Sequence, residues 1–255
     1  MADFEKLSLP GSHLSFRFDP PAAEKRAAPC FVFLHGFGSD QTGEKAEHFR
    51  KKALERGLAF CSFDFQGHGK SGGTMRELTI SRNLSNLGAV HETLRGRGCS
   101  RLVLLGSSMG GFTGIWYAAK HPEEILAGCH IAPAFGMAEG FLAWAGREGA
   151  AKWEKEGHVL FENGFVHSEL GWEWIRDLRT FDTKWLQKNY RTPTLILQGK
   201  KDDSVPWRGV VDFAAGCEFE GIDLHFFADG DHRLTDRKDR LWALSEEFLR
   251  GRGIL

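Results

Sequence analysis

The feature that most constrains the fold is an apolar run followed at once by a serine between two glycines. Leu102-Val103-Leu104-Leu105 precedes Gly106-Ser107-Ser108-Met109-Gly110, which has the spacing G-x-S-x-G, and a helical segment at 112–120 follows. In a sharp strand-to-helix turn, the backbone on either side of the apex comes too close for side chains, and glycine removes that clash. The pattern therefore predicts a strand–turn–helix with the Ser108 hydroxyl at its apex.

Repeated strand and helix patterns on both sides of this turn predict the rest of the architecture. Apolar runs predict strands at 30–34, 58–63, 102–105, 125–132, 194–198 and 222–228, with helical segments between them. Strands that are apolar throughout, alternating with helices, are typical of a mostly parallel sheet covered on both faces. Segments 4–9 and 14–18 alternate apolar and polar residues across Pro10-Gly11, which predicts an N-terminal antiparallel hairpin.

The segment 133–191 interrupts the alternation and is rich in aromatic residues. We expect residues 1–132 and 192–255 to form the α/β core, and 133–191 to form a helical cap over the edge where such sheets bind ligands. Most cap rings should pack among themselves, while Trp144 and Trp172 are candidates for lining an apolar substrate pocket. The cap aromatics are Trp144, Trp153, Trp172, Trp174, Trp185, Phe135, Phe141, Phe161, Phe165 and Phe181.

Composition excludes several functional classes. The 255 residues carry a formal net charge of −1, so no global field favours nucleic acid or an acidic membrane. No apolar run approaches the roughly 18 residues that span a bilayer. The five cysteines have neither disulfide-framework nor zinc-site spacing, which indicates a reducing compartment and no metal. Because the sequence begins without a secretory pattern, we expect a cytoplasmic protein.

Two loops carry the partners that a serine nucleophile needs. A serine hydroxyl becomes reactive when a base takes its proton and a third group orients that base. Asp202 and Asp203 follow the strand at 194–198, and His232 follows the strand at 222–228. The carboxyl ends of parallel strands meet at one edge of a sheet, so both loops should reach the edge where Ser108 lies. Either aspartate could orient His232.

At this point the chain resembles the α/β-hydrolase family. The landmarks lie in family order and in register with the expected strands: His35-Gly36-Phe37, Gly67-His68-Gly69-Lys70-Ser71, Gly106-Ser107-Ser108-Met109-Gly110-Gly111, Gly199-x-x-Asp202-x-x-Val205-Pro206 and Asp231-His232. The resemblance implies Ser108 as nucleophile and His232 as general base and then acid. The family spacing places the acid three residues after Gly199, which selects Asp202 over Asp203.

The resemblance also implies an oxyanion hole made by the backbone N–H groups of Phe37 and Met109. Segment 201–207 and Asp231-His232-Arg233 are similar to the branch containing the mitochondrial acyl-protein thioesterase that also cleaves acyl glucuronides. We therefore expect a cofactor-free serine hydrolase acting on the ester or thioester of a small-molecule or acylated substrate with an apolar part. Amidase or aminopeptidase-like hydrolysis by the same triad remains open, because the two activities share this machinery.

Overall fold

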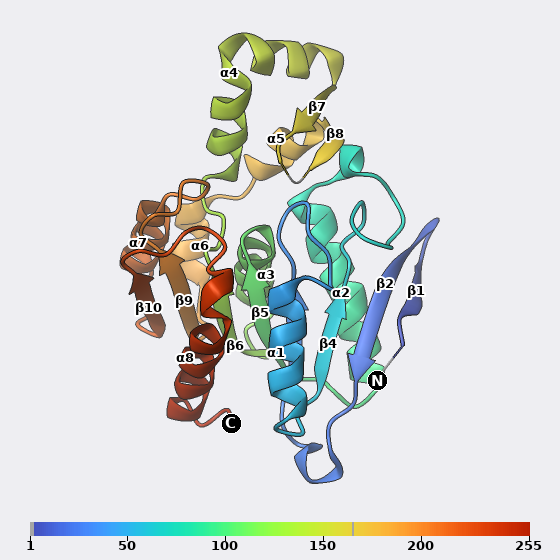
Figure 1. Ribbon diagram of the computed structural model, residues 1–255, viewed down its shortest axis with the longest axis vertical. Coiled ribbons are helices and arrows are strands. Elements are labelled where there is room, and N and C mark those ends of the chain that lie inside the picture. Colours follow the sequence, from blue (N-terminus) through green and yellow to red (C-terminus); the bar gives the residue numbers. More distant parts are fainter. Residues whose placement is uncertain (1–2, 165) are drawn as a thin grey trace.

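The computed structural model describes residues 3–164 and 166–255. Within them, an eight-stranded sheet runs in the order β1-β2-β4-β3-β5-β6-β9-β10 (Figure 1). The pairs β1–β2 and β2–β4 are antiparallel, and the remaining pairs are parallel. This confirms the predicted α/β-hydrolase sheet with its N-terminal antiparallel hairpin.

The elements follow the predicted ranges closely. The strands are β1 (Glu5–Leu9), β2 (Ser12–Asp19), β3 (Cys30–Leu34), β4 (Phe60–Phe63), β5 (Leu102–Ser107), β6 (Ile125–Ile131), β7 (His158–Glu162), β8 (His167–Gly171), β9 (Thr194–Gly199) and β10 (Ile222–Phe227). The α-helices are α1 (Glu44–Leu54), α2 (Ile80–Gly96), α3 (Met109–Lys120), α4 (Met137–Glu156), α5 (Glu173–Leu178), α6 (Thr183–Asn189), α7 (Trp207–Gly216) and α8 (Lys238–Gly251). Short 3-10 helices occupy Ala23–Lys25, Met75–Glu77 and Thr235–Arg237.

The central strands are apolar throughout because both of their faces are buried. Successive side chains of a strand point to opposite faces. In β5, Leu104 packs in the hydrophobic cluster that contains Ile115 of α3. Its neighbour Val103 packs in the opposite cluster, which contains Phe49 of α1 and Leu241 of α8. The two clusters hold α1 and α8 on one side of the sheet and α3 on the other (Figure 1).

The cap is not wholly helical, contrary to expectation. Strands β7 and β8 form an antiparallel pair inside it, and α4 bends at Gly146, whose φ of 67° is not helical. Gly157, in the left-handed region at φ 76°, ends α4 and turns the chain into β7. Figure 1 shows α4 and the β7–β8 pair at one end of the molecule, beyond the main sheet. Phe165 lies outside the described residues.

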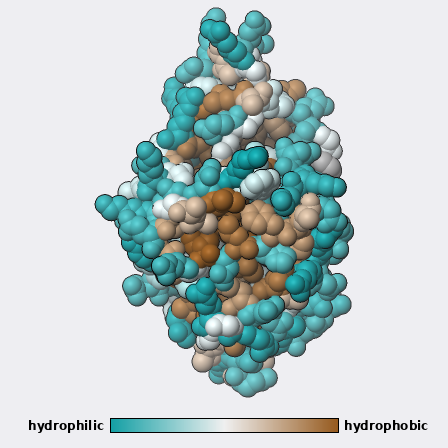
Figure 2. Space-filling model, turned by 90° about the vertical axis from the view of Figure 1, so that its left-hand side faces the viewer, coloured by the Kyte–Doolittle hydropathy of each residue, from teal (hydrophilic) through white to brown (hydrophobic). Residues whose placement is uncertain are grey.

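The two edge strands of the sheet are β1 and β10. Figure 2 views the molecule from the side where α7 and β10 lie in Figure 1, and it shows hydrophobic side chains gathered across the middle of that face. Ile222, Leu224 and Phe226 of β10 are half-buried. In the described part of the chain, none of the helices combines the length and the apolar character that a membrane crossing requires.

Candidate active site

Ser108 occupies a strained turn between β5 and α3. Its φ of 54° and ψ of −116° lie outside the regions that non-glycine residues normally adopt. The flanking glycines admit this turn, as predicted. A Cβ on Gly106 would lie 2.6 Å from the Cα of Gly111, and one on Gly110 would lie 2.2 Å from the carbonyl oxygen of Leu34. Both approaches are too close for any side chain, so the sequence G-x-S-x-G is a steric requirement of this turn.

The loops after β9 and β10 bring Asp202 and His232 to Ser108. The Nε2 atom of His232 lies 3.1 Å from Oγ of Ser108, and its Nδ1 lies 2.8 Å from Oδ2 of Asp202. Asp203 is exposed, and its Oδ1 accepts a hydrogen bond from the Ser204 hydroxyl. The structure therefore places Asp202, and not Asp203, in line with the imidazole and the elbow hydroxyl.

The Asp202 carboxylate is fixed by four donors. The N–H groups of Ser204 and Val205 donate to Oδ1 at 2.9 and 2.7 Å. The Nε2 amide of Gln198 donates to Oδ2 at 2.9 Å, beside the imidazole of His232. Burial alone would raise the pKa of Asp202, but the hydrogen bonds and the charge of His232 outweigh it and hold that pKa below its ordinary value. The carboxylate thus stays ionised and accepts from Nδ1–H.

Gln198 was missed by sequence reasoning, although a signal was present. It is the last residue but one in β9 and is fully buried among apolar neighbours. A buried amide needs hydrogen-bond partners, and the carboxylate that follows the strand supplies one. A polar residue near the carboxyl end of an otherwise apolar strand can therefore mark a residue that supports a site.

The two loops are joined to each other. Lys201 N–H donates to the carbonyl oxygen of Gly230 at 2.9 Å. A Cβ on Gly199 would lie 2.4 Å from the carbonyl oxygens of both Asp231 and Gly230, so β9 ends in direct backbone contact with the histidine loop. The Asp231 carboxylate accepts the N–H of Leu234 at 2.7 Å and closes the turn that follows His232. These contacts set the separation between the imidazole and its aspartate.

The loop after β3 lies against the elbow. A Cβ on Gly36 would lie 3.4 Å from Cβ of Ser108, so this loop passes close to the nucleophile. The N–H of Phe37 donates no hydrogen bond within the described residues. Met109 is the first residue of α3, so its N–H has no acceptor in the helix. Within the described residues, neither predicted oxyanion donor is engaged by another acceptor, and the Met109 N–H lies at a helix N-terminus, which favours negative charge.

His35 and Asp64 anchor the two ends of this loop. His35 donates from Nδ1 to the carbonyl oxygen of Gly36 at 2.8 Å and accepts the Phe65 N–H on Nε2 at 3.0 Å. Burial lowers the pKa of His35 to about 4, so the ring is neutral and can do both. Asp64 accepts the N–H of Gln41 at 2.7 Å and that of Lys70 at 2.8 Å. The carboxylate therefore ties this loop to the one that follows β4.

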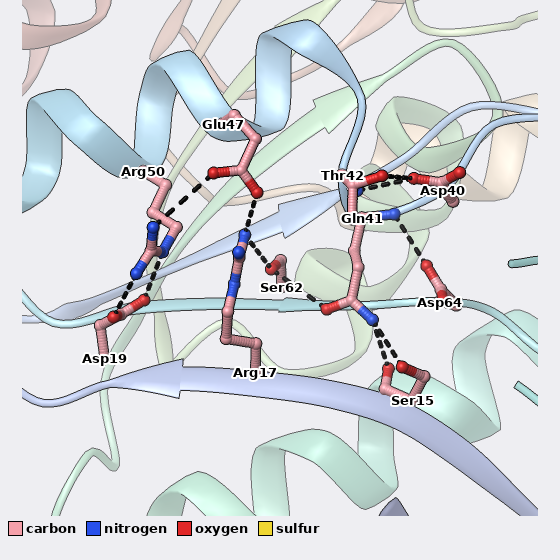
Figure 3. A network of polar contacts seen from close by, with 10 residues as sticks. All are labelled: Ser15, Arg17, Asp19, Asp40, Gln41, Thr42, Glu47, Arg50, Ser62 and Asp64. Atoms are coloured by element: carbon pink, nitrogen blue, oxygen red, sulfur yellow. Dashed lines mark hydrogen bonds and ion pairs between the residues drawn. The ribbon is translucent and has the colours of Figure 1, made fainter. Parts of the chain in front are cut away.

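A buried polar network continues from Gln41 to the edge of the sheet (Figure 3). The Gln41 amide donates to the carbonyl oxygen of Ser15 on β2 at 3.0 Å, and Ser62 of β4 connects it to Arg17. Farther along, Arg50 of α1 makes a bidentate pair with Asp19, with both N···O distances 2.6 Å. The network holds α1, and the loop that leads into it, against β2 and β4.

The two named candidates for substrate contact, Trp144 and Trp172, pack against other aromatic rings of the cap. Trp172 packs edge-on against Trp153 inside the cap, with ring centroids 5.4 Å apart. Trp144 is 44% exposed and touches Phe161. Other cap aromatics, namely Phe141, Phe161 and Trp174, surround the ring of Phe37. Sequence reasoning named these three only as members of the cap.

Known proteins resemble this chain along most of its length. Residues 25–161 match the model of the family described as serine aminopeptidase, S33. The mouse palmitoyl-protein thioesterase ABHD10 is 26% identical over 237 residues, which cover 84% of this chain and 72% of the relative. The human serine hydrolase BPHL is 25% identical over 229 residues, covering 84% and 76%.

Solved structures show the same fold. Mouse alpha/beta hydrolase domain-containing protein 10 superimposes with a TM-score of 0.84 at 22% identity, covering 98% of this chain and 99% of that one. Est1E from Butyrivibrio proteoclasticus, solved with ferulic acid, gives a TM-score of 0.77 at 21% identity, with coverages of 96% and 99%. The family match spans the elbow, the loop after β3 and the first part of the cap. The chain is an enzyme of the α/β-hydrolase class and belongs to the serine aminopeptidase S33 family.

Proposed function

We propose that this enzyme cleaves carboxylic esters or thioesters of a substrate with an apolar part, through an acyl-enzyme on Ser108. The observation that carries the proposal is the unbroken hydrogen-bonded chain from the Ser108 hydroxyl through the His232 imidazole to the Asp202 carboxylate. Such a chain turns a weakly nucleophilic hydroxyl into a reactive one.

In the first half-reaction, Ser108 Oγ attacks the substrate carbonyl carbon while its proton passes to Nε2 of His232. Asp202 fixes the tautomer and stabilises the imidazolium. The negative oxygen of the tetrahedral intermediate would be held by the N–H groups of Phe37 and Met109. The intermediate collapses, the bond to the alcohol or thiol breaks, and that leaving group takes the proton from His232. An ester between Ser108 and the acyl group remains.

In the second half-reaction, water replaces the departed alcohol or thiol. His232 removes a proton from the water as its oxygen attacks the acyl carbon, and the same two N–H groups hold the second oxyanion. Collapse breaks the bond to Ser108 Oγ, which recovers its proton from His232. The carboxylic acid leaves, and the enzyme returns to its starting state without a cofactor.

Two observations favour esters and thioesters with an apolar part. The mouse and human ABHD10 relatives are named palmitoyl-protein thioesterases, and the Butyrivibrio protein Est1E was solved with ferulic acid, an aromatic acid. In this chain, aromatic side chains of the cap gather beside the loop that faces Ser108. An acyl group that displaces water from these rings gains hydrophobic free energy, about 25 cal/mol for each Å² buried.

The alternative is amide or peptide hydrolysis, which the family description, serine aminopeptidase, favours. The triad and the two N–H donors serve that reaction equally well. An aminopeptidase additionally needs an acidic group that binds the free amine of its substrate. Comparing substrates decides between the two activities.

The experiment measures kcat/KM for three substrate classes on one preparation: p-nitrophenyl esters from acetate to palmitate, the matching acyl thioesters, and aminoacyl-naphthylamides. Ser108→Ala serves as the matched control. We expect turnover of esters and thioesters that rises beyond acetate and disappears in Ser108→Ala. Faster turnover of the naphthylamides would support the aminopeptidase alternative. Equal ester turnover in Ser108→Ala would overturn both.

A further inference from the structure

Phe37 belongs to two parts of the molecule at once. Its backbone N–H lies in the loop that passes close to Ser108, while its ring points among four other rings. The centroid distances are 5.2 Å to Phe141, 5.4 Å to Phe161, 6.3 Å to Trp174 and 6.2 Å to His68. We call these four rings the aromatic cage. The contacts with Phe141, Phe161 and His68 are edge-to-face, a favourable geometry for aromatic pairs.

Three sides of the aromatic cage come from the cap, each from a different element. Phe141 lies on α4, Phe161 on β7 and Trp174 on α5. The cap also touches the next residue of the loop, because a Cβ built on Gly38 would lie 2.1 Å from Cγ2 of Val166. Only a glycine at this position lets Val166 approach so closely. The cap therefore packs directly against residues 37 and 38.

Phe37 and Gly38 are the central residues of a turn that the Ser39 N–H closes on the carbonyl oxygen of Gly36 at 3.2 Å. His35 and Gln41 anchor the ends of the loop by hydrogen bonds, but neither Phe37 nor Gly38 makes a backbone hydrogen bond to any described residue. His68 contributes an uncharged ring: it is buried, and burial lowers its pKa to about 3. The turn fixes the local backbone of the loop tip, and the ring contacts that hold the tip against the rest of the molecule come from the cap and from His68.

We propose that the aromatic cage positions the oxyanion hole. The Phe37 ring is held by Phe141, Phe161 and Trp174, and this orients the Phe37 N–H toward the oxyanion that forms above Ser108. This inference rests on the proposed function. The cap then contributes to the chemical step itself as well as to enclosing the substrate. A loss of contact between cap and loop should lower transition-state stabilisation more than it lowers ground-state binding.

The test replaces cage residues and measures kcat and KM for an ester and for its thiono analogue, in which C=S replaces C=O. Sulfur accepts hydrogen bonds weakly, so the thiono ester draws little benefit from an oxyanion hole. For Phe37→Ala and Phe141→Leu, we expect kcat for the oxo ester to fall about 10- to 100-fold, as a misplaced group typically causes. The thiono rate should fall much less, which shrinks the oxo/thiono rate ratio.

Trp185→Ala is the matched control, since Trp185 is an exposed cap aromatic that stacks on Trp116 and does not touch Phe37. It should leave the rate ratio unchanged, and Phe161→Tyr, which keeps the ring, should also preserve it. Phe141 is only half-buried, so its variant should fold, and thermal unfolding checks this. An unchanged rate ratio in folded Phe37→Ala and Phe141→Leu would overturn the proposal while leaving the triad intact. Failure of the proposed function would instead appear as undiminished turnover in Ser108→Ala.

Discussion

The Nε2 atom of His232 lies within 3.1 Å of the Ser108 hydroxyl, although 124 positions of sequence separate the two residues. The contact is made by two loops that follow different, mutually parallel strands of one sheet. Because β5 and β10 run in the same direction, the residues after them reach the same edge. The folding of the sheet therefore assembles the proposed catalytic groups.

Asp202→Asn should abolish most activity, whereas Asp203→Asn should not. An amide at position 202 cannot stabilise the imidazolium and favours the wrong tautomer of His232, so kcat should fall roughly 10⁴-fold. Asp203 is exposed and bonds only its neighbour Ser204, so its variant should stay within about twofold of wild type. Steady-state kinetics on one ester with both variants checks this. A larger loss in Asp203→Asn would mean that the acid has been misidentified.

His130→Leu should reduce the acid sensitivity of the fold. His130 is fully buried in β6 with neither ring nitrogen paired among the described residues, and burial lowers its pKa to about 3. The unfolded chain binds a proton below about pH 6.5, where the folded chain does not. The neutral ring therefore stabilises the fold fully above that pH, and this contribution is lost as the pH falls toward 3.

Chemical denaturation between pH 7 and pH 4.5 measures this linkage. The wild-type free energy of unfolding should fall more steeply than that of His130→Leu, by up to about 1.4 kcal/mol per pH unit, which corresponds to one proton. His167→Leu is the matched control, because its imidazole is 67% exposed. Parallel pH profiles for wild type and His130→Leu would show that His130 does not resist protonation in the folded state.

Asp19→Leu should destabilise the fold more than removal of both members of its ion pair. Arg50 and Asp19 form a bidentate pair whose side chains are only 7% and 8% exposed. Removing Asp19 leaves the buried Arg50 guanidinium with the carboxylate of Glu47 alone, 3.7 Å away, and a buried charge that loses its only partner typically costs about 3–5 kcal/mol. The double variant Asp19→Leu with Arg50→Met should cost less. Urea unfolding of the singles and the double tests this, and an additive loss would contradict it.

Much of the core could be predicted because its elements carry local signals. The apolar run at 30–34 was expected as a strand and forms β3 with the same bounds. Gly106 is required by the close approach of Gly110 and Gly111 within the turn, and Gly110 by the close approach of the end of β3. Asp202 and Asp203 could not be separated by residue type, since both follow β9. Family spacing selected Asp202, which is the aspartate that lies beside His232.

The cap could not be predicted in the same way, because its structure depends on contacts between distant segments. The β7–β8 pair consists of short strands with charged and exposed residues, and only Phe161 of β7 is buried. Its pairing with β8 carries no strong local pattern. The aromatic composition predicted a packed cap, but not that Phe161 meets Phe37 while Trp172 meets Trp153. Which ring faces which is a property of the fold alone.

The most direct test of the account is to react the folded protein with a fluorophosphonate and locate the adduct by mass spectrometry of its peptides. Such a reagent labels only a serine that a neighbouring base has activated. We predict one adduct, on Ser108, with no labelling of Ser108→Ala and slow labelling of His232→Ala. An adduct on another residue, or none on folded wild-type protein, would contradict the assignment of Ser108 as the nucleophile.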